Sequence, residues 1–159
     1  MTARDIESIG QGISRLQRLL GSRRVFSRLA AAASIELTQQ ATQVLLALDR
    51  EGCSVAKLAT AAHMDVGAVS RQLRVLEDAR LALRRPSPVH GRIVIVRASA
   101  SGAALAARVR SVRSRHLQDA LRAWSAADRK QLAMLMNRLV TDLQAAPYRQ
   151  EASGARGGT

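Results

Sequence analysis

Residues 81–97 are the part of this sequence in which apolar residues stop repeating at helical spacing. The run LALRR and the four consecutive β-branched residues at 93–96 are typical of short strands. The intervening PSPVHG holds two prolines and a glycine, which suit a turn but not a strand interior. The segment predicts a β-hairpin with strands over 81–85 and 92–97.

Three short helical segments precede this hairpin, and each begins at a residue type that commonly caps helices. Thr38, Ser54 and Asp65 stand at the three starts, where their side-chain oxygens can accept from free backbone N–H groups. The first segment is expected to end at Gly52, and a turn at 63–65 separates the other two. Helix, turn, helix and a two-stranded wing is the order of a winged helix-turn-helix.

Long helical segments flank this lobe. Residues 3–33 are predicted to form one helix, and two more are expected near 100–122 and 126–144, capped at Ser99 and Ser125. The apolar stripe of the first helix packs on its own domain or forms a dimer seam, and the pattern alone favours neither. That stripe is Ile6, Ile9, Ile13, Leu16 and Leu20, and the last helix carries Leu132, Leu135, Leu139 and Leu143.

Aromatic residues are almost absent, with only Phe26, Trp124 and Tyr148 among 159 residues. The core must therefore come from Leu, Val, Ile and Ala, which favours closely packed helices. The predicted fold class is mainly α with a small β-hairpin wing.

The net charge of +13 indicates an anionic partner, either nucleic acid or an anionic membrane surface. An ordinary basic protein is the alternative, because heavy use of arginine partly reflects a GC-rich genome. The placement of the charge on one predicted helix favours nucleic acid. On residues 66–77, one side holds Val66, Val69, Leu73 and Leu76, and the other holds Gly67, Ser70, Arg71 and Arg74. A face that is small at its start and basic beyond suits entry into a DNA major groove.

Four motifs together resemble the MarR-type (multiple antibiotic resistance) transcriptional regulators. They are LT at 37–38, LA at 58–59, DVGAVSRQLRVLE at 65–77 and RRPSPVHGR at 84–92. The resemblance covers about residues 5–145. It implies a homodimer that binds pseudo-palindromic double-stranded operators, usually as a repressor, in the bacterial cytoplasm and on the nucleoid. Residues 1–36 and 100–145 would be dimerisation helices, 37–99 the winged helix-turn-helix lobe, and 146–159 a disordered tail.

The same resemblance implies which residues meet DNA. Residues 66–77 would be the recognition helix and 81–97 the wing, with Arg92 entering the minor groove and Ser70 and Arg71 touching DNA. The candidate DNA-binding residues are Gly67, Ser70, Arg71, Arg74, Arg84, Arg85, His90 and Arg92. Ligands of the family lie between the dimer helices and the lobe. Arg24, Arg28, His63 and Met64 are candidates to line such a pocket for a small anionic effector, with core packing and surface charge as the alternative roles.

Three positions depart from the family pattern. His90-Gly91-Arg92 replaces Asp-x-Arg, so Arg84 and Arg85 are expected to lose that aspartate as a partner. Arg80 stands where glycine is usual, and a left-handed backbone there would cost about 1 kcal/mol, so an altered turn is expected. Ala98-Ser99 replaces the usual Leu-Thr.

Other kinds of site find little support in the sequence. The single cysteine, Cys53, excludes an intrachain disulfide, fits a reducing cytosol and is interpreted as structural. His63, His90 and His116 lack the spacing of metal ligands, and no catalytic constellation stands out, so neither cofactor nor enzymatic activity is expected. The N-terminal residues lack the layout of a signal peptide, and no run of about 18 apolar residues occurs, so neither a leader nor a membrane span is expected.

Three functions remain open from the sequence. The first is a sequence-specific dimeric repressor, released in some cases by a small ligand. The second is a non-specific or architectural DNA-binding protein, and the third is a winged-helix protein-interaction module without operator specificity.

Overall fold

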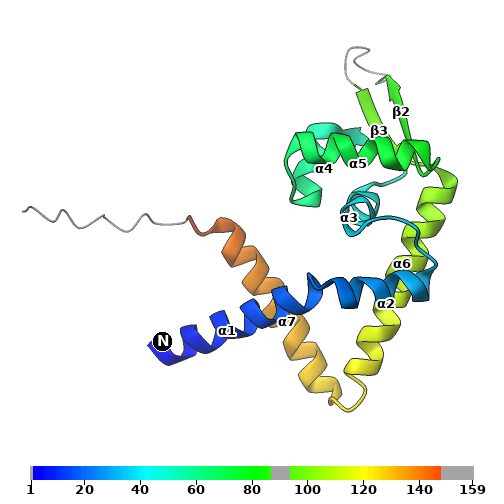
Figure 1. Cartoon of the computed structure of the whole chain (residues 1–159). Helices are drawn as coiled ribbons and strands as arrows, with labels where there is room; N and C mark the ends of the chain where they lie inside the picture. Colours follow the sequence, from blue (N-terminus) through cyan, green and yellow to red (C-terminus); the bar gives the residue numbers. More distant parts are fainter. Residues whose placement is uncertain (1, 87–93, 148–159) are drawn as a thin grey trace, which may run out of the picture. The chain divides into compact units, whose positions relative to one another are not determined.

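The computed structural model describes residues 2–86 and 94–147 (Figure 1). The fold is mainly helical with one small antiparallel sheet, as the sequence predicts, and the chain divides into two compact units, residues 1–116 and 117–159. The elements are α1 (Ala3–Leu20), α2 (Arg23–Ala33), α3 (Gln39–Ala47), β1 (Cys53–Ser54), α4 (Val55–Ala62), α5 (Val66–Asp78), β2 (Ala82–Pro86), β3 (Val94–Ala98), α6 (Ala100–Ala120) and α7 (Ala126–Ala145).

The prediction of a single helix over residues 3–33 is wrong. The first helix ends at Leu20, and a second begins at Arg23. Ser22 has extended backbone angles, and its hydroxyl accepts a hydrogen bond from the Val25 N–H at 3.2 Å. A serine whose hydroxyl accepts from the N–H three residues later favours the start of a new helix over continuation of the preceding one, because the hydroxyl takes the place of a main-chain carbonyl as acceptor.

The expected stop at Gly52 is also wrong, because α3 ends at Ala47 and the buried Leu48 is already extended. Gly52 instead lies in the loop that follows, with a φ of +95°. A Cβ atom on Gly52 would lie 2.6 Å from Cγ2 of Ile95, so glycine lets this loop lie directly against β3.

The sheet has the strand order β1-β3-β2, with both pairs antiparallel. Ala82 pairs with Ala98, Arg84 with Val96, and Pro86 with Val94. Pro86 lies at the end of an edge strand, where its missing N–H is tolerated. The two-residue strand β1 was not predicted, because so short a segment carries no alternation of its own.

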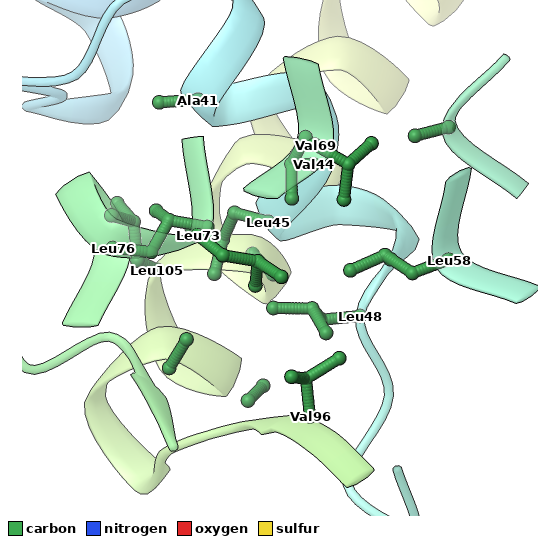
Figure 2. Close-up of a cluster of buried hydrophobic side chains, with 14 of the residues drawn as sticks. Ala41, Val44, Leu45, Leu48, Leu58, Val69, Leu73, Leu76, Val96 and Leu105 are labelled. Carbon is green, nitrogen blue, oxygen red and sulfur yellow. The ribbon is translucent and has the colours of Figure 1, made fainter. Parts of the chain in front are cut away.

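The core of the first unit lies where α3, α4 and α5 meet β3 and α6 (Figure 2). Its largest side chains are leucines and valines, as the shortage of aromatic residues predicts. The labelled members in Figure 2 are Ala41, Val44, Leu45, Leu48, Leu58, Val69, Leu73, Leu76, Val96 and Leu105.

Two arginines of α6 fasten the ends of earlier helices rather than face solvent alone. Arg108 Nε donates to the Ala33 carbonyl at 2.7 Å, and Arg110 Nη2 donates to the Leu46 carbonyl at 2.9 Å. Carbonyl groups at helix C-termini lack intrahelical donors and carry partial negative charge, so a guanidinium stabilises them.

The turn after α5 keeps the left-handed backbone that the sequence led us to doubt. Arg80 has a φ of +58°, its N–H donates to the Glu77 carbonyl at 2.8 Å, and the Leu81 N–H donates to the Leu76 carbonyl at 2.7 Å. This bond pair is a Schellman helix ending. The expectation of an altered turn is therefore wrong, and Arg80 adopts the conformation usual for glycine despite its side chain.

Helices α1 and α7 carry apolar side chains that remain exposed to solvent in the described part of the chain. Neither α1 nor α7 buries a residue, although Ile13, Leu132 and Leu139 are half-buried. Leu20 is 60% exposed and Leu143 is 57% exposed. Among the described residues, no helix is both long and apolar enough to cross a membrane.

Replacing Arg80 with Gly should raise the free energy of unfolding by about 0.5–1 kcal/mol, because glycine relieves left-handed strain at a small cost in unfolded-chain entropy. The neighbouring Ala79→Gly variant is the control, since Ala79 has a φ of −77° and gains nothing from glycine. Urea denaturation at one fixed protein concentration measures both, and equal destabilisation by the two variants would contradict the strain at Arg80.

Candidate nucleic-acid interface

A three-residue turn, His63–Asp65, joins α4 to α5 and sets the direction of the second helix. His63 has a φ of +51°, and the Met64 N–H donates to the Ala59 carbonyl at 3.0 Å, which closes α4. Oδ1 of Asp65 accepts from the Ala68 N–H at 2.7 Å, so the carboxylate is turned toward the backbone, as predicted. The helix-turn-helix prediction for residues 54–78 is confirmed.

The two faces of α5 largely follow the helical period. Val69, Leu73 and Leu76 are fully buried in the core. Val66, which the helical period places on the same side, is 51% exposed. It lies in the first turn at the edge of the apolar stripe, next to the exposed residues of the turn.

The opposite face of α5 is small at its start and basic after it. Gly67, Arg71 and Arg74 are exposed, and Ser70 is half-buried. A Cβ atom on Gly67 would lie 3.6 Å from Nη1 of Arg71, which shows that the Arg71 guanidinium reaches back over the first turn. This direction is usual for long side chains on helices. The cation therefore lies beside the N-terminal end of α5, where backbone N–H groups also attract anions.

One contact between α5 and α3 was not foreseen. Gln72 Nε2 donates to Gln40 Oε1 at 3.2 Å, which joins the middle of α5 to the first turn of α3. Both side chains are polar and no spacing rule pairs residues 32 positions apart, so no local signal could have found this bond.

Strand β2 lies next to the end of α5 (Figure 1). Arg84 Nε lies 2.5 Å from Glu77 Oε1, so an acid of α5 that was not foreseen from the sequence pairs with Arg84. Arg85 is exposed and follows Arg84 on the other face of β2. His90 and Arg92, predicted to contact DNA, lie outside the described residues.

Less than a third of the net charge belongs to this lobe. Residues 37–99 contain nine basic and five acidic residues, a net charge of +4 out of +13. What distinguishes the lobe is thus the exposure of Arg71 and Arg74 on one face of α5 and of Arg85 on β2, rather than its total charge.

An open hollow of about 340 Å³ lies elsewhere in the first unit, between α3, the end of α4 and α6. His63 lines it, as predicted, but the other candidates do not. Arg24 and Arg28 are exposed on α2, and Met64 packs against the core. The lining residues are Gln39, Gln43, Leu46, Ala47, Ala61, Ala62, His63 and Arg113.

Arg113 supplies the permanent charge of this hollow. The residue is exposed as a whole, yet packing around its guanidinium lowers the pKa of Arg113 by desolvation. Gln43 Nε2 donates to the Ala62 carbonyl at 2.6 Å, and its second N–H can donate to a bound group. A desolvated cation beside amide groups suits a small anion.

Cys53 lies half-buried in β1, and the described part of the chain gathers no three His, Cys, Asp or Glu side chains that could hold a metal ion. Burial raises the pKa of the Cys53 thiol, and the nearby Asp49 raises it further against a smaller opposing effect of Lys57. A thiol with a raised pKa is mostly protonated near neutral pH and reacts slowly.

Comparison with known proteins gives a family match for part of the chain. Residues 35–93 match the model of the MarR family, which confirms the resemblance stated from the sequence over that segment. No curated protein matches the sequence significantly. Solved structures therefore provide the remaining comparisons.

Several solved structures share the fold over most of the chain. A MarR family protein from Bacillus stearothermophilus has a TM-score of 0.76 at 14% identity, covering 91% of this chain and 99% of its own. The regulator BldR from Sulfolobus solfataricus has a TM-score of 0.70 at 22% identity, with coverages of 89% and 99%. A MepR variant from S. aureus, bound to an oligodeoxyribonucleotide, has a TM-score of 0.54 at 20% identity, with coverages of 82% and 97%. The fold is that of the winged-helix MarR regulators.

Native Cys53 should react with iodoacetamide at pH 8 several-fold more slowly than the urea-unfolded chain, because its raised pKa leaves less thiolate. Asp49→Asn is the matched change: it removes the charge but keeps an acceptor for the Gly52 N–H, and it should speed the native reaction. Equal rates for native and unfolded protein would overturn the interpretation of Cys53 as a protected structural thiol.

Proposed function

We propose that the protein is a homodimeric, sequence-specific DNA-binding regulator of the bacterial cytoplasm, acting as a repressor at pseudo-palindromic operators. The observation that carries the proposal is the exposed face of α5, the second helix of the helix-turn-helix, which presents Gly67, Arg71 and Arg74. The MarR match over residues 35–93 supports the same function.

The α5 face has the properties that a major groove requires. The absence of a side chain at Gly67 leaves room near base edges, and the Arg71 and Arg74 guanidinium groups can donate two hydrogen bonds to guanine or bind phosphate. Half-buried Ser70 offers a hydroxyl to the backbone of the duplex. The N-terminal end of α5 adds backbone donors that favour phosphate.

The wing provides the second contact in the proposal. Arg85 is exposed on the face of β2 opposite to the lobe, where phosphate can reach it. By resemblance to the family, Arg92 enters a narrow minor groove, whose negative potential attracts arginine. His90 lies two residues before Arg92 in the sequence.

The uncovered apolar stripes of α1 and α7 support the homodimer. Ile6, Ile9 and Leu16 on α1, and Leu135 and Leu143 on α7, are between 42% and 57% exposed. Stripes of this kind at helical spacing are expected to lose their solvent exposure against a second copy.

The proposal includes a small anionic effector in the hollow beside Arg113. MepR, a solved structure of similar fold, is bound to ethidium, which shows that a ligand enters at least one protein of this fold. The volume of about 340 Å³ falls at the lower end of the range of ligand-pocket volumes.

Benzoate, a small anion, should raise the melting temperature of the protein, and neutral benzamide should not. If benzoate still stabilises the Arg113→Gln variant, this site is excluded.

One observation favours a second function, non-specific coating of DNA. Nine of the thirteen excess charges lie outside residues 37–99, and charge spread over the whole chain binds any duplex. Binding of that kind collapses as salt rises, whereas operator binding retains a base-specific part. A chain that binds no duplex even at low salt would be the protein-interaction module.

The test begins with selection of bound sequences from a random DNA pool. Arg71→Ala should cost about 1–3 kcal/mol on the selected duplex and should relax the base preference at one symmetric position. Arg122→Ala removes the same charge from an exposed site outside the lobe and should leave the base preference intact. Affinities at two salt concentrations check both variants, and equal affinity of the Arg71 variant and wild type would sink the proposed role of α5.

The homodimer has its own test on α7. Replacing Leu135 and Leu143 together with Asp should yield monomers, because two charges would then enter the seam. Thr141→Asp lies about 180° around the same helix and should leave the dimer intact. Sedimentation velocity at micromolar concentration distinguishes these states, and a wild-type monomer there would refute the dimer.

A further inference from the structure

We infer that Glu77 and Arg84 form a tether that sets the orientation of the wing against α5, so that Arg84 supports DNA binding by positioning rather than by touching DNA. This inference rests on the proposed function, and it assigns Arg84 a different role from the direct DNA contact expected from the sequence.

The tether joins two elements with different tasks. Glu77 lies in the last turn of α5, and Arg84 is the third residue of β2. Arg84 Nε and Glu77 Oε1 are 2.5 Å apart, which is a charge-assisted hydrogen bond. Their side chains are 36% and 26% exposed, so both remain partly in contact with solvent.

The register of the sheet explains why Arg84 reaches α5. Arg84 pairs with Val96, which is fully buried, and residues directly opposite in a sheet share a face. Arg84 therefore projects from the side of β2 that covers the lobe. Arg85 pairs with Ile95 on the other side, so the two neighbouring arginines face opposite directions.

The position of Glu77 in its helix calls for a partner. A carboxylate in the last turn of a helix lies beside carbonyl groups of partial negative charge, which disfavours it. The ion pair with Arg84 offsets that repulsion. Residues 79–118 contain nine arginines and no acidic residue, so an acid for the wing has to come from outside this stretch.

Other contacts hold the base of the wing but not its outer part. The Ser99 hydroxyl donates to the Arg80 carbonyl at 2.8 Å, and Ala82 pairs with Ala98 at the start of β2. Arg84 lies two residues farther out. Its side chain is thus placed to restrain the part of the hairpin that leads toward the expected DNA contact.

The direction in which DNA affinity changes in a Glu77 variant distinguishes a positioning role from a purely electrostatic one. Glu77→Gln removes a negative charge near DNA, and by charge alone binding should tighten. If Glu77 positions the wing, affinity should instead fall about two- to fivefold, the size expected of a partly exposed ion pair. Asp78→Asn removes the adjacent exposed charge and should bind as well as wild type or better.

A double-mutant cycle with Arg84→Ala then tests whether Arg84 meets DNA itself. The probe is a duplex selected by the wild-type protein from a random pool. For a tether, the double variant is no weaker than Arg84→Ala alone, and the salt dependence of each variant keeps the wild-type slope. Additive losses, or a slope lowered by about one unit for each phosphate that a subunit no longer binds, would make Arg84 a direct DNA ligand and overturn the inference.

Amide hydrogen exchange in the DNA-free protein reports on the tether independently of DNA binding. Residues of β2 should exchange faster in Glu77→Gln than in wild type, while Asp78→Asn leaves them unchanged. Unchanged exchange in Glu77→Gln would refute the tether even if DNA binds. If no duplex is selected at all, the proposed function fails, and faster exchange still supports the tether.

Discussion

The carbonyl group of Leu81 is the point on which the geometry of the lobe depends. The Ser99 N–H donates to it at 3.0 Å, and α6 passes so close that a Cβ atom on Gly102 would lie 2.0 Å from this oxygen. No side chain larger than hydrogen fits at Gly102 without moving the backbone. This one contact therefore brings together the end of α5, the start of β2 and the start of α6.

That junction relates the parts of the proposed interface. The Schellman ending at Arg80 directs the chain from α5 into β2, and Ser99 fastens β3 and α6 to the same corner. The angle between the exposed face of α5 and the wing then depends on main-chain bonds at the start of β2 and on the Glu77–Arg84 pair farther along that strand. Arg80 stays left-handed because these bonds outweigh a strain of about 1 kcal/mol.

Local features of this fold could be predicted from the sequence, whereas features that depend on distant residues could not. Helix starts at Thr38, Ser54 and Asp65 were foreseen because a cap bonds to an N–H three residues away. Strand β1 exists only because β3 lies beside it, about forty residues later in the chain. The break at Ser22 was missed because the apolar stripe continues through residue 20 and masks a good N-cap.

The candidate site likewise has parts that could be predicted from local sequence and parts that could not. The buried positions Val69, Leu73 and Leu76 follow from helical periodicity, and so does the basic face that includes Arg71. The partner of Arg84 did not follow, because Glu77 reaches it through the fold and not through a motif. The net charge of the chain predicted the site least well, because not every arginine is available to a partner. Arg108 and Arg110 donate hydrogen bonds to carbonyl groups at the C-terminal ends of α2 and α3.

The central claim is that α5 and the wing of two subunits read DNA together. Hydroxyl-radical footprinting of a duplex selected from a random pool tests this most directly. The account predicts two protected half-sites related by symmetry, with centres about 10 base pairs apart or a multiple of that distance. Uniform protection that is independent of sequence, or protection of a single half-site at saturation, would contradict it.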